Sequence, residues 1–339
     1  MRNNQNRMGV SAPVENLQSS NVEPQNTQSL DFIVPTEIVD LPSKGLFYQE
    51  GHPLHLKETV EIKHMTTKEE DILTNQSYIK NGTAIDRLIK SILVDKNINV
   101  NDLLIGDRNA ITVAARVYGY GADYETKYSC PSCGASQTTL FDLNDVKPND
   151  FEDSLLEFDA EIDYNLKTIN ITVPRTDTAL QLKVLSENTR NKKQKNKNLV
   201  SEFFQKVIKT VNGNSDPRYI KSYIQSMSAL DSRYVRAAYQ KMIPDVDMNC
   251  DFECQVCAYE TQVEVPLSAD FFGLSNEYIK SVYEQFFYMK YYGGWSLFEL
   301  YSLPIGLRRW YVQLLSDHKK KEKEEIEKAT KRSNSHIRR

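Results

Sequence analysis

Four of the chain's five cysteines stand in two Cys-x-x-Cys pairs, Cys130 with Cys133 and Cys254 with Cys257. Two thiolates at this spacing can occupy two corners of a tetrahedral zinc site, so two pairs can complete it. Gly134 directly follows the first pair, where a tight turn favours unrestricted backbone angles, and the second pair lacks a glycine there. The pattern predicts one structural zinc ion (Zn²⁺) bound by all four cysteines.

Other interpretations of these cysteines stay open. A redox Cys-x-x-Cys motif needs only one pair, with a helix that begins at its first cysteine. Disulfides need an oxidising compartment, and no signal-peptide pattern places the chain in one. Four unrelated free thiols are the third alternative.

The role of the fifth cysteine, Cys250, is a separate question. It shares strand parity with Met248 and Phe252, which favours a buried core thiol. The alternative is that Cys250 replaces Cys254 or Cys257 as a metal ligand.

Segments with strand-like alternation flank both pairs, which disfavours the redox interpretation. These segments are Tyr124 to Tyr128, Gln137 to Phe141, Met248 to Phe252 and Thr261 to Val265. Two hairpins with cysteine pairs at their tips form a zinc ribbon, here split by a long insertion. The predicted ion therefore connects the N-terminal part of the chain to the C-terminal part. If the two pairs meet across two chains instead, the site would make a homo-oligomer.

We predict an α+β fold in which this split, zinc-ribbon-like pair of hairpins joins an N-terminal α+β module to a C-terminal helical region. A mostly helical insertion separates the hairpins. The predicted segments are a disordered Asn/Gln-rich arm (1–30), the N-terminal module with the first knuckle (31–150), a mostly helical middle region (151–245) with a basic linker (190–198), the second knuckle hairpin (246–269), an aromatic-rich helical region (270–316) and a charged C-terminal tail (317–339).

Local signals place elements inside the N-terminal module. Residues 59–63 alternate as a strand, and a capping box, Thr66 with Glu69 or Thr67 with Glu70, begins a helix. A second helix is predicted near Thr83, with these apolar residues on one face: Ile85, Leu88, Ile89, Ile92 and Leu93.

The middle region is predicted to contain several helices. Thr176 to Ser186 is predicted as a helix, and helical spacing continues from Leu199 to Val211. Further helices are expected to begin at Asp216-Pro217, where an acid precedes proline, and at Ser228, with Asp231 three residues on.

The helix predicted over residues 276–292 carries more aromatic side chains than one narrow core face can hold. Part of this surface is therefore expected to bind another chain, and the alternative is that it covers the chain's own sheet. The residues predicted to contact a partner are Tyr283, Phe286, Phe287, Tyr291, Trp295 and Trp310.

Composition excludes some classes of protein. The formal net charge of −4 over 339 residues gives no global case for nucleic-acid binding. No apolar run approaches the roughly 18 residues that a membrane span needs.

No catalytic motif accompanies the cysteines. The five histidines show no His-Glu-x-x-His spacing, and the chain has no phosphate-binding loop, nucleophile elbow or dinucleotide fingerprint. A site filled by four thiolates also leaves no open position for water. We therefore predict that the protein is not an enzyme.

Several motifs, taken in order, resemble the bacteriophage T4-type baseplate hub (tail assembly) protein family over roughly residues 31 to 330. They are Phe32-Ile-Val-Pro35, Leu41-Pro-Ser-Lys-Gly-Leu-Phe-Tyr48, Met65 to Leu73, Tyr128 to Gly134, Leu230 to Arg236, Tyr291 to Ser296, Leu303-Pro304 and Arg308-Arg309-Trp310.

The resemblance implies a non-enzymatic role in the central hub of a contractile tail baseplate. It also implies partners among the other baseplate and tail hub proteins. Assembly is expected in the host cytoplasm, with a place in the virion tail as one outcome and a transient assembly factor as the other.

The alternative function is a nucleic-acid-binding zinc-ribbon protein, such as a phage transcription factor. A basic patch that binds nucleic acid should lie beside aromatic side chains that stack on bases. Here the basic runs are poor in aromatics, and the aromatic helix carries few positive charges. The sequence therefore favours the structural role.

Overall fold

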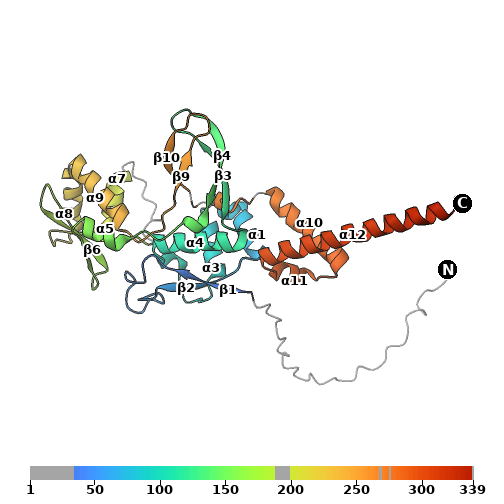
Figure 1. The fold of residues 1–339 in the computed structure, drawn as a ribbon. Helices are drawn as coiled ribbons and strands as arrows, with labels where there is room; N and C mark the ends of the chain where they lie inside the picture. Colours follow the sequence, from blue (N-terminus) through green and yellow to red (C-terminus); the bar gives the residue numbers. More distant parts are fainter. Residues whose placement is uncertain (1–33, 188–198, 266, 268, 275, 338–339) are drawn as a thin grey trace, which may run out of the picture. The chain divides into compact units, whose positions relative to one another are not determined.

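The computed structural model describes residues 34–187, 199–265, 267, 269–274 and 276–337 of the chain (Figure 1). These residues form helices and small antiparallel sheets, which confirms the predicted α+β class. Residues from Val34 onward form one compact unit. The predicted arm (1–30) and basic linker (190–198) lie outside the described residues, and the finer boundaries stay predictions.

The described unit begins with a hairpin of β1 (Thr36–Asp40) and β2 (Thr59–Lys63). Val39 pairs with Val60, and Val60 and Ile62 are buried while the other side chains of β2 are exposed. The predicted strand is therefore confirmed. The helices that follow are α1 (Thr67–Thr74), α2 (Gln76–Lys80), α3 (Ala84–Ile92), the 3₁₀ helix η2 (Val100–Asp102) and α4 (Ile105–Tyr120).

Sequence signals explain where α1 and α3 lie. Thr66 caps α1 and forms a capping box with Glu69, the first of the two predicted pairs. The predicted apolar face of α3 is buried along its length: Ile85, Leu88, Ile89, Ile92 and Leu93. Burying each such side chain contributes about 1.5–3 kcal/mol, so this face fixes the helix against the core.

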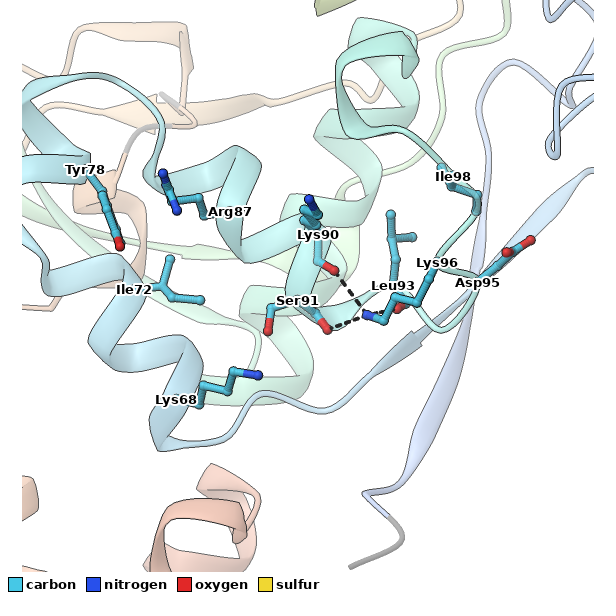
Figure 2. A pocket seen from close by; sticks show the side chains of 10 residues that line it. All are labelled: Lys68, Ile72, Tyr78, Arg87, Lys90, Ser91, Leu93, Asp95, Lys96 and Ile98. Carbon is cyan, nitrogen blue, oxygen red and sulfur yellow. Dashed lines mark hydrogen bonds between the residues drawn. The ribbon is translucent and has the colours of Figure 1, made fainter. Parts of the chain in front are cut away.

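A pocket of about 510 Å³ opens beside these helices. Figure 2 shows its lining side chains, which come from α1, α2, α3 and the loop after α3.

A buried carboxylate, Asp107 in the first turn of α4, fixes the turn-rich segment between β1 and β2. Ser43 donates to it through its backbone N–H (3.0 Å) and its hydroxyl (2.6 Å), and the Tyr48 hydroxyl donates at 2.8 Å. Gly45 holds the turn with a φ of +70°, and a Cβ there would lie 2.4 Å from the backbone nitrogen of Lys57. The turn therefore requires glycine at this position.

The middle region contains a four-stranded antiparallel sheet, of strand order β5-β6-β7-β8, as well as helices. The strands are β5 (Glu161–Asp163), β6 (Thr168–Val173), β7 (Thr178–Lys183) and β8 (Ile208–Val211). The helices are α5 (Phe151–Glu157), α7 (Leu199–Val207), α8 (Pro217–Ser226) and α9 (Ala229–Met242).

Two expectations for this region are wrong. The predicted helix over Thr176 to Ser186 is strand β7, because Leu180 and Leu182 alternate with more exposed residues and pair with the strands on either side. The helical spacing from Leu199 ends at Val207, and the residues up to Val211 form β8.

The two predicted helix starts in the middle region are confirmed. Asp216 accepts a hydrogen bond from the Arg218 N–H, with Pro217 in the first turn. Ser228 caps α9 by accepting from the N–H of Asp231.

The C-terminal helices are α10 (Asn276–Gly293), α11 (Leu297–Ser302) and α12 (Ile305–Ile337), preceded by the 3₁₀ helix η4 (Ala269–Phe272). They bury a small core of their own: Val282, Phe286, Met289, Leu300 and Leu303. The predicted charged tail continues α12, and its described side chains from 320 to 330 are exposed. Among the described residues, no helix combines the length and apolar character that a membrane crossing requires.

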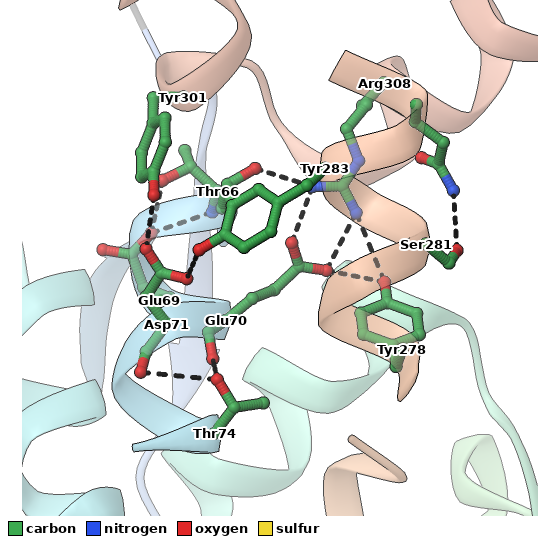
Figure 3. A network of polar contacts seen from close by, with 12 residues as sticks. Thr66, Glu69, Glu70, Asp71, Thr74, Tyr278, Ser281, Tyr283, Tyr301 and Arg308 are labelled. Atoms are coloured by element: carbon green, nitrogen blue, oxygen red, sulfur yellow. Dashed lines mark hydrogen bonds and ion pairs between the residues drawn. The ribbon is translucent and has the colours of Figure 1, made fainter. Parts of the chain in front are cut away.

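A fully buried ion pair joins these helices to α1. The Arg308 guanidinium donates to both oxygens of Glu70, at 2.6 and 2.9 Å (Figure 3). Arg308 also donates to the Thr67 hydroxyl at 2.7 Å, and the hydroxyls of Tyr278 and Tyr120 donate to Glu70 at 2.6 and 3.2 Å. One carboxylate therefore ties α1 to α4, α10 and α12.

The protonation states follow from this burial. Burial alone would lower the pKa of Arg308, but its bonds to Glu70 raise the pKa above the ordinary value, so the guanidinium stays charged. Burial and then Glu70 raise the pKa of Tyr278 and Tyr120. Both phenols therefore stay protonated and remain donors.

Removing the charge of Glu70 should destabilise the protein strongly. We expect Glu70→Gln to lower the free energy of unfolding by about 3–5 kcal/mol, because Arg308 would be left buried without its counter-charge. Urea unfolding measures the change.

The matched control is Glu152→Gln, which breaks an exposed pair with Lys44 at 2.7 Å and should cost less than about 1 kcal/mol. Similar costs for the two variants would show that the buried pair does not hold the C-terminal helices.

Candidate metal centre

Each cysteine pair lies at the tip of a two-stranded hairpin. The first hairpin is β3 (Asp123–Ser129) with β4 (Ser136–Asp142), and the second is β9 (Asn249–Glu253) with β10 (Glu260–Glu264). Ser129 pairs with Ser136 and Glu253 with Glu260, so both turns contain only the knuckle residues. The predicted hairpins are therefore present.

The two knuckles share one backbone conformation. The N–H of Gly134 donates to the Cys130 carbonyl at 2.9 Å, and the N–H of Ala258 donates to the Cys254 carbonyl at 2.8 Å. Gly134 has a φ of +73° and Ala258 a φ of +53°. Alanine thus takes the left-handed conformation that glycine takes in the first knuckle, at the steric cost of its Cβ.

The knuckles bring all four sulfur atoms together. The Sγ atoms of Cys130 and Cys257 lie 3.7 Å apart, and those of Cys133 and Cys254 lie 3.6 Å apart. All four lie within 4.8 Å of one another, and none is in a disulfide. Four sulfurs about 2.3 Å from one zinc ion would be separated by roughly 3.8 Å, so the set fits a tetrahedral metal.

Cys130 and Cys254 are buried, and Cys133 and Cys257 are exposed. Backbone N–H groups of Cys257 and Val256 lower the pKa of Cys254 to about 6. The Ala135 N–H acts in the same direction on Cys133, but hydrogen bonds with the neighbouring sulfurs outweigh it and raise the pKa of Cys133 to about 12. All four sulfurs would therefore be thiolates together only if a cation balanced their charge.

Contacts between the hairpins support the cluster. The Gln137 side chain donates to the Glu253 carbonyl at 2.8 Å and accepts from the Gln255 N–H at 2.9 Å. Tyr128 and Phe252 meet edge to face, 4.8 Å between ring centroids. Gln137 was predicted only as part of a strand, and nothing in the local pattern marks it as a residue that contacts a hairpin so distant in the chain.

Cys250 lies outside the four-cysteine cluster. It is half-buried and packs against the core beside Met248 and Phe252, so the expected core thiol is only partly covered. Burial raises the pKa of Cys250.

The six residues predicted to contact a partner differ in exposure. Phe286 is 3% exposed and packs in the core of the C-terminal helices, which corrects its assignment to the surface. Trp295 is half-buried against Tyr311. The other four are exposed, at 45% (Tyr283), 70% (Phe287 and Tyr291) and 55% (Trp310), and their contact with a partner stays a prediction.

The geometry defines an α+β protein whose two distant hairpins meet at a cluster of four cysteines that can hold a metal ion. Residues 36–273 match the family model described as T4 bacteriophage base plate protein, and the chain belongs to this family. The match ends before α10. No curated protein and no solved structure matched the chain.

The two knuckles should respond in opposite directions to matched substitutions. We expect Gly134→Ala to lower the free energy of unfolding by about 1 kcal/mol, because the left-handed conformation penalises a Cβ. Nothing lies within 4 Å of that Cβ, so the cost is one of backbone conformation.

Ala258→Gly should raise the same free energy by up to about 1 kcal/mol, because relief of the strain exceeds the added entropy of the unfolded chain. Chemical denaturation of both variants measures the pair. A loss of stability in Ala258→Gly would contradict the equivalence of the two knuckles.

Proposed function

We propose that this protein is a non-enzymatic structural or assembly component of the central hub of a contractile phage tail baseplate. The family match over residues 36–273 carries the proposal. The sequence motifs that resemble baseplate hub proteins support the assignment to the hub in particular. In this proposal the protein is assembled in the host cytoplasm and acts in the tail through contacts with other baseplate proteins.

We further propose that the four-cysteine cluster binds a structural zinc ion. Thiolate ligands in a tetrahedral set suit zinc, and four of them leave no coordination position for water or substrate. The sulfur separations of 3.6 and 3.7 Å support this choice. The ion would link two hairpins that are far apart in the chain, so metal binding and docking of the second hairpin would stabilise each other.

Loss of one ligand tests the zinc proposal. Cys133→Ser should remove the zinc from the purified protein, and it should lower the melting temperature because the hairpins lose their shared ion. Metal analysis by mass spectrometry and thermal unfolding give the two readouts.

Cys250→Ser is the control, since Cys250 lies outside the cluster, and it should keep the zinc. If wild-type protein purified in zinc-containing medium carried no zinc, or if a chelator left its melting temperature unchanged, the proposal would fail.

The exposed aromatic surface, defined by Phe287 and Tyr291 of α10, is the proposed contact with neighbouring baseplate proteins, and Trp310 of α12 is a further exposed aromatic side chain. Phe287 stacks on Tyr291 at 5.8 Å between centroids, and both rings are 70% exposed. The core of the C-terminal helices is complete without them. Large aromatic side chains that the fold does not bury are typical anchors of protein interfaces.

Truncating this surface should weaken assembly without unfolding the protein. We expect Phe287→Ala/Tyr291→Ala to lose co-purification with tail proteins from infected cells, because binding depends on a few aromatic anchors.

Leu140→Ala/Leu156→Ala is the matched control, since those side chains are 64% and 80% exposed elsewhere on the protein. Equal recovery of tail proteins with both variants would place the contact elsewhere. Self-association lost in the first variant alone would identify the partner as a second copy of the chain.

A further inference from the structure

The pocket of about 510 Å³ beside α1, α2 and α3 is lined by an excess of positive charge (Figure 2). Its cationic residues are Lys68 on α1, Arg87 and Lys90 on α3, and Lys96 in the loop that follows. Asp95 is the acidic residue of the lining. The pocket belongs neither to the cysteine cluster nor to the aromatic surface.

The fold itself does not neutralise this charge. Among the residues that the structure describes, no ion pair involves Lys68, Arg87 or Lys90. Two acids of this region have other partners: Glu69 accepts a hydrogen bond from the Ser91 hydroxyl at 2.6 Å, and Asp95 accepts one from the Asn97 N–H at 2.9 Å.

Two of the cations are held in place by their own contacts. The Lys96 ammonium donates to the carbonyls of Lys90, Ser91 and Leu93, at 3.1, 3.1 and 2.6 Å. The Arg87 guanidinium lies over the Tyr78 ring, 4.1 Å from its centroid. Stacking leaves the guanidinium edge free to donate two parallel hydrogen bonds, the arrangement that a carboxylate accepts.

The electrostatic environment of Lys96 agrees with an unbalanced pocket. Burial lowers the pKa of Lys96, and the charges of Lys63, Lys68 and Lys90 lower it further, while Glu69 acts in the opposite direction and offsets part of the shift. An anion in the pocket would relieve this repulsion.

Three aliphatic residues, Ile72, Leu93 and Ile98, also line the pocket, together with Tyr78 and Ser91. A ligand that contacts both the cations and the aliphatic residues of the pocket carries carboxylates next to aliphatic side chains. Nucleic acid fits less well, because its binding sites combine an extended basic track with exposed aromatic platforms, whereas this lining is compact and its aromatic ring, Tyr78, lies under Arg87.

From this geometry we infer that the pocket formed by α1, α2 and α3 binds an acidic peptide segment of a partner protein, with Lys68, Arg87 and Lys90 contacting its carboxylates. The aliphatic wall receives a leucine- or isoleucine-like side chain next to them. This contact is separate from the proposed hub role of the aromatic surface, and its test does not depend on that role.

Fluorescence anisotropy with the full chain tests the inference. The probe is a labelled Glu-Leu-Asp-Glu-Leu-Asp peptide, and its neutral counterpart is Gln-Leu-Asn-Gln-Leu-Asn. We expect the acidic probe to bind at least about tenfold more tightly than the neutral one, since hydrogen bonds to charged groups are the strong ones. Added salt should weaken this binding.

Arg87→Gln/Lys90→Gln should reduce binding of the acidic probe by about tenfold or more, with an unchanged melting temperature. Lys221→Gln/Arg233→Gln removes the same charge from the exposed faces of α8 and α9 and should bind as the wild type does. The reversed variant Arg87→Glu/Lys90→Glu should instead bind a Lys-Leu-Lys-Lys-Leu-Lys peptide.

Three outcomes would overturn the inference. The first is equal binding of the acidic and neutral probes by the wild type. The second is an equal loss of binding in the pocket variant and in the Lys221→Gln/Arg233→Gln control. The third is displacement of the probe by inorganic phosphate or by a DNA duplex at lower concentration than by unlabelled peptide, which would assign the pocket to phosphate groups.

Discussion

The carboxylate of Glu70 lies in the interior, where an unpaired charge would cost several kcal/mol, and this constraint fixes α10 and α12 against α1. The requirement is met by Arg308, which is 238 positions further along the chain, and by the hydroxyls of Tyr278 and Tyr120. Because α12 must deliver the guanidinium to α1, the loop before α12 is also fixed, and the Ile305 N–H donates to the Met65 carbonyl at 3.0 Å. Two of the motifs that resemble the baseplate hub family, Met65 to Leu73 and Arg308-Arg309-Trp310, are therefore in contact through the Glu70–Arg308 pair.

The cysteine cluster imposes a second constraint of the same kind, since both pairs are needed for one site. The meeting of these four cysteines could be predicted because a Cys-x-x-Cys turn is local: its spacing and the alternation of the flanking strands describe each half. The left-handed conformation of Ala258 was not predicted, because alanine rarely adopts it and its residue type gives no sign of it. The hydrogen bonds of Gln137 to the second hairpin could not be predicted either, since a glutamine on a strand is usually a surface residue.

The errors in the predicted fold have different causes. Strand β7 follows β6 after a short turn, and its alternating Leu180 and Leu182 were a local strand signal that the helix prediction overlooked. Its other neighbour, β8, lies further along the chain, and that pairing has no local signature. Phe286 shows the same limit at a single residue. It lies among exposed aromatics in the sequence, but the return of α11 places Tyr301 against its ring, 5.5 Å between centroids. Helix starts were predicted correctly at Thr66, Asp216 and Ser228 because a cap is satisfied within three residues. Non-local packing thus explains the error at Phe286, whereas the error at β7 concerned a local alternation.

Some polar and aromatic side chains stabilise the fold itself, and others lie exposed on the surface of the described part of the chain. Glu70 and Asp107 are buried, and both accept hydrogen bonds from other parts of the chain. These bonds position α1 and α4. Phe287 and Tyr291 stack only on their own helix, and Arg87 and Lys90 are cations without a carboxylate among the described residues. Exposed apolar area and unbalanced charge both raise the free energy of the isolated chain relative to a bound state. The exposed aromatic side chains and these cations of this baseplate-family protein are therefore consistent with a component that binds other proteins through its surface.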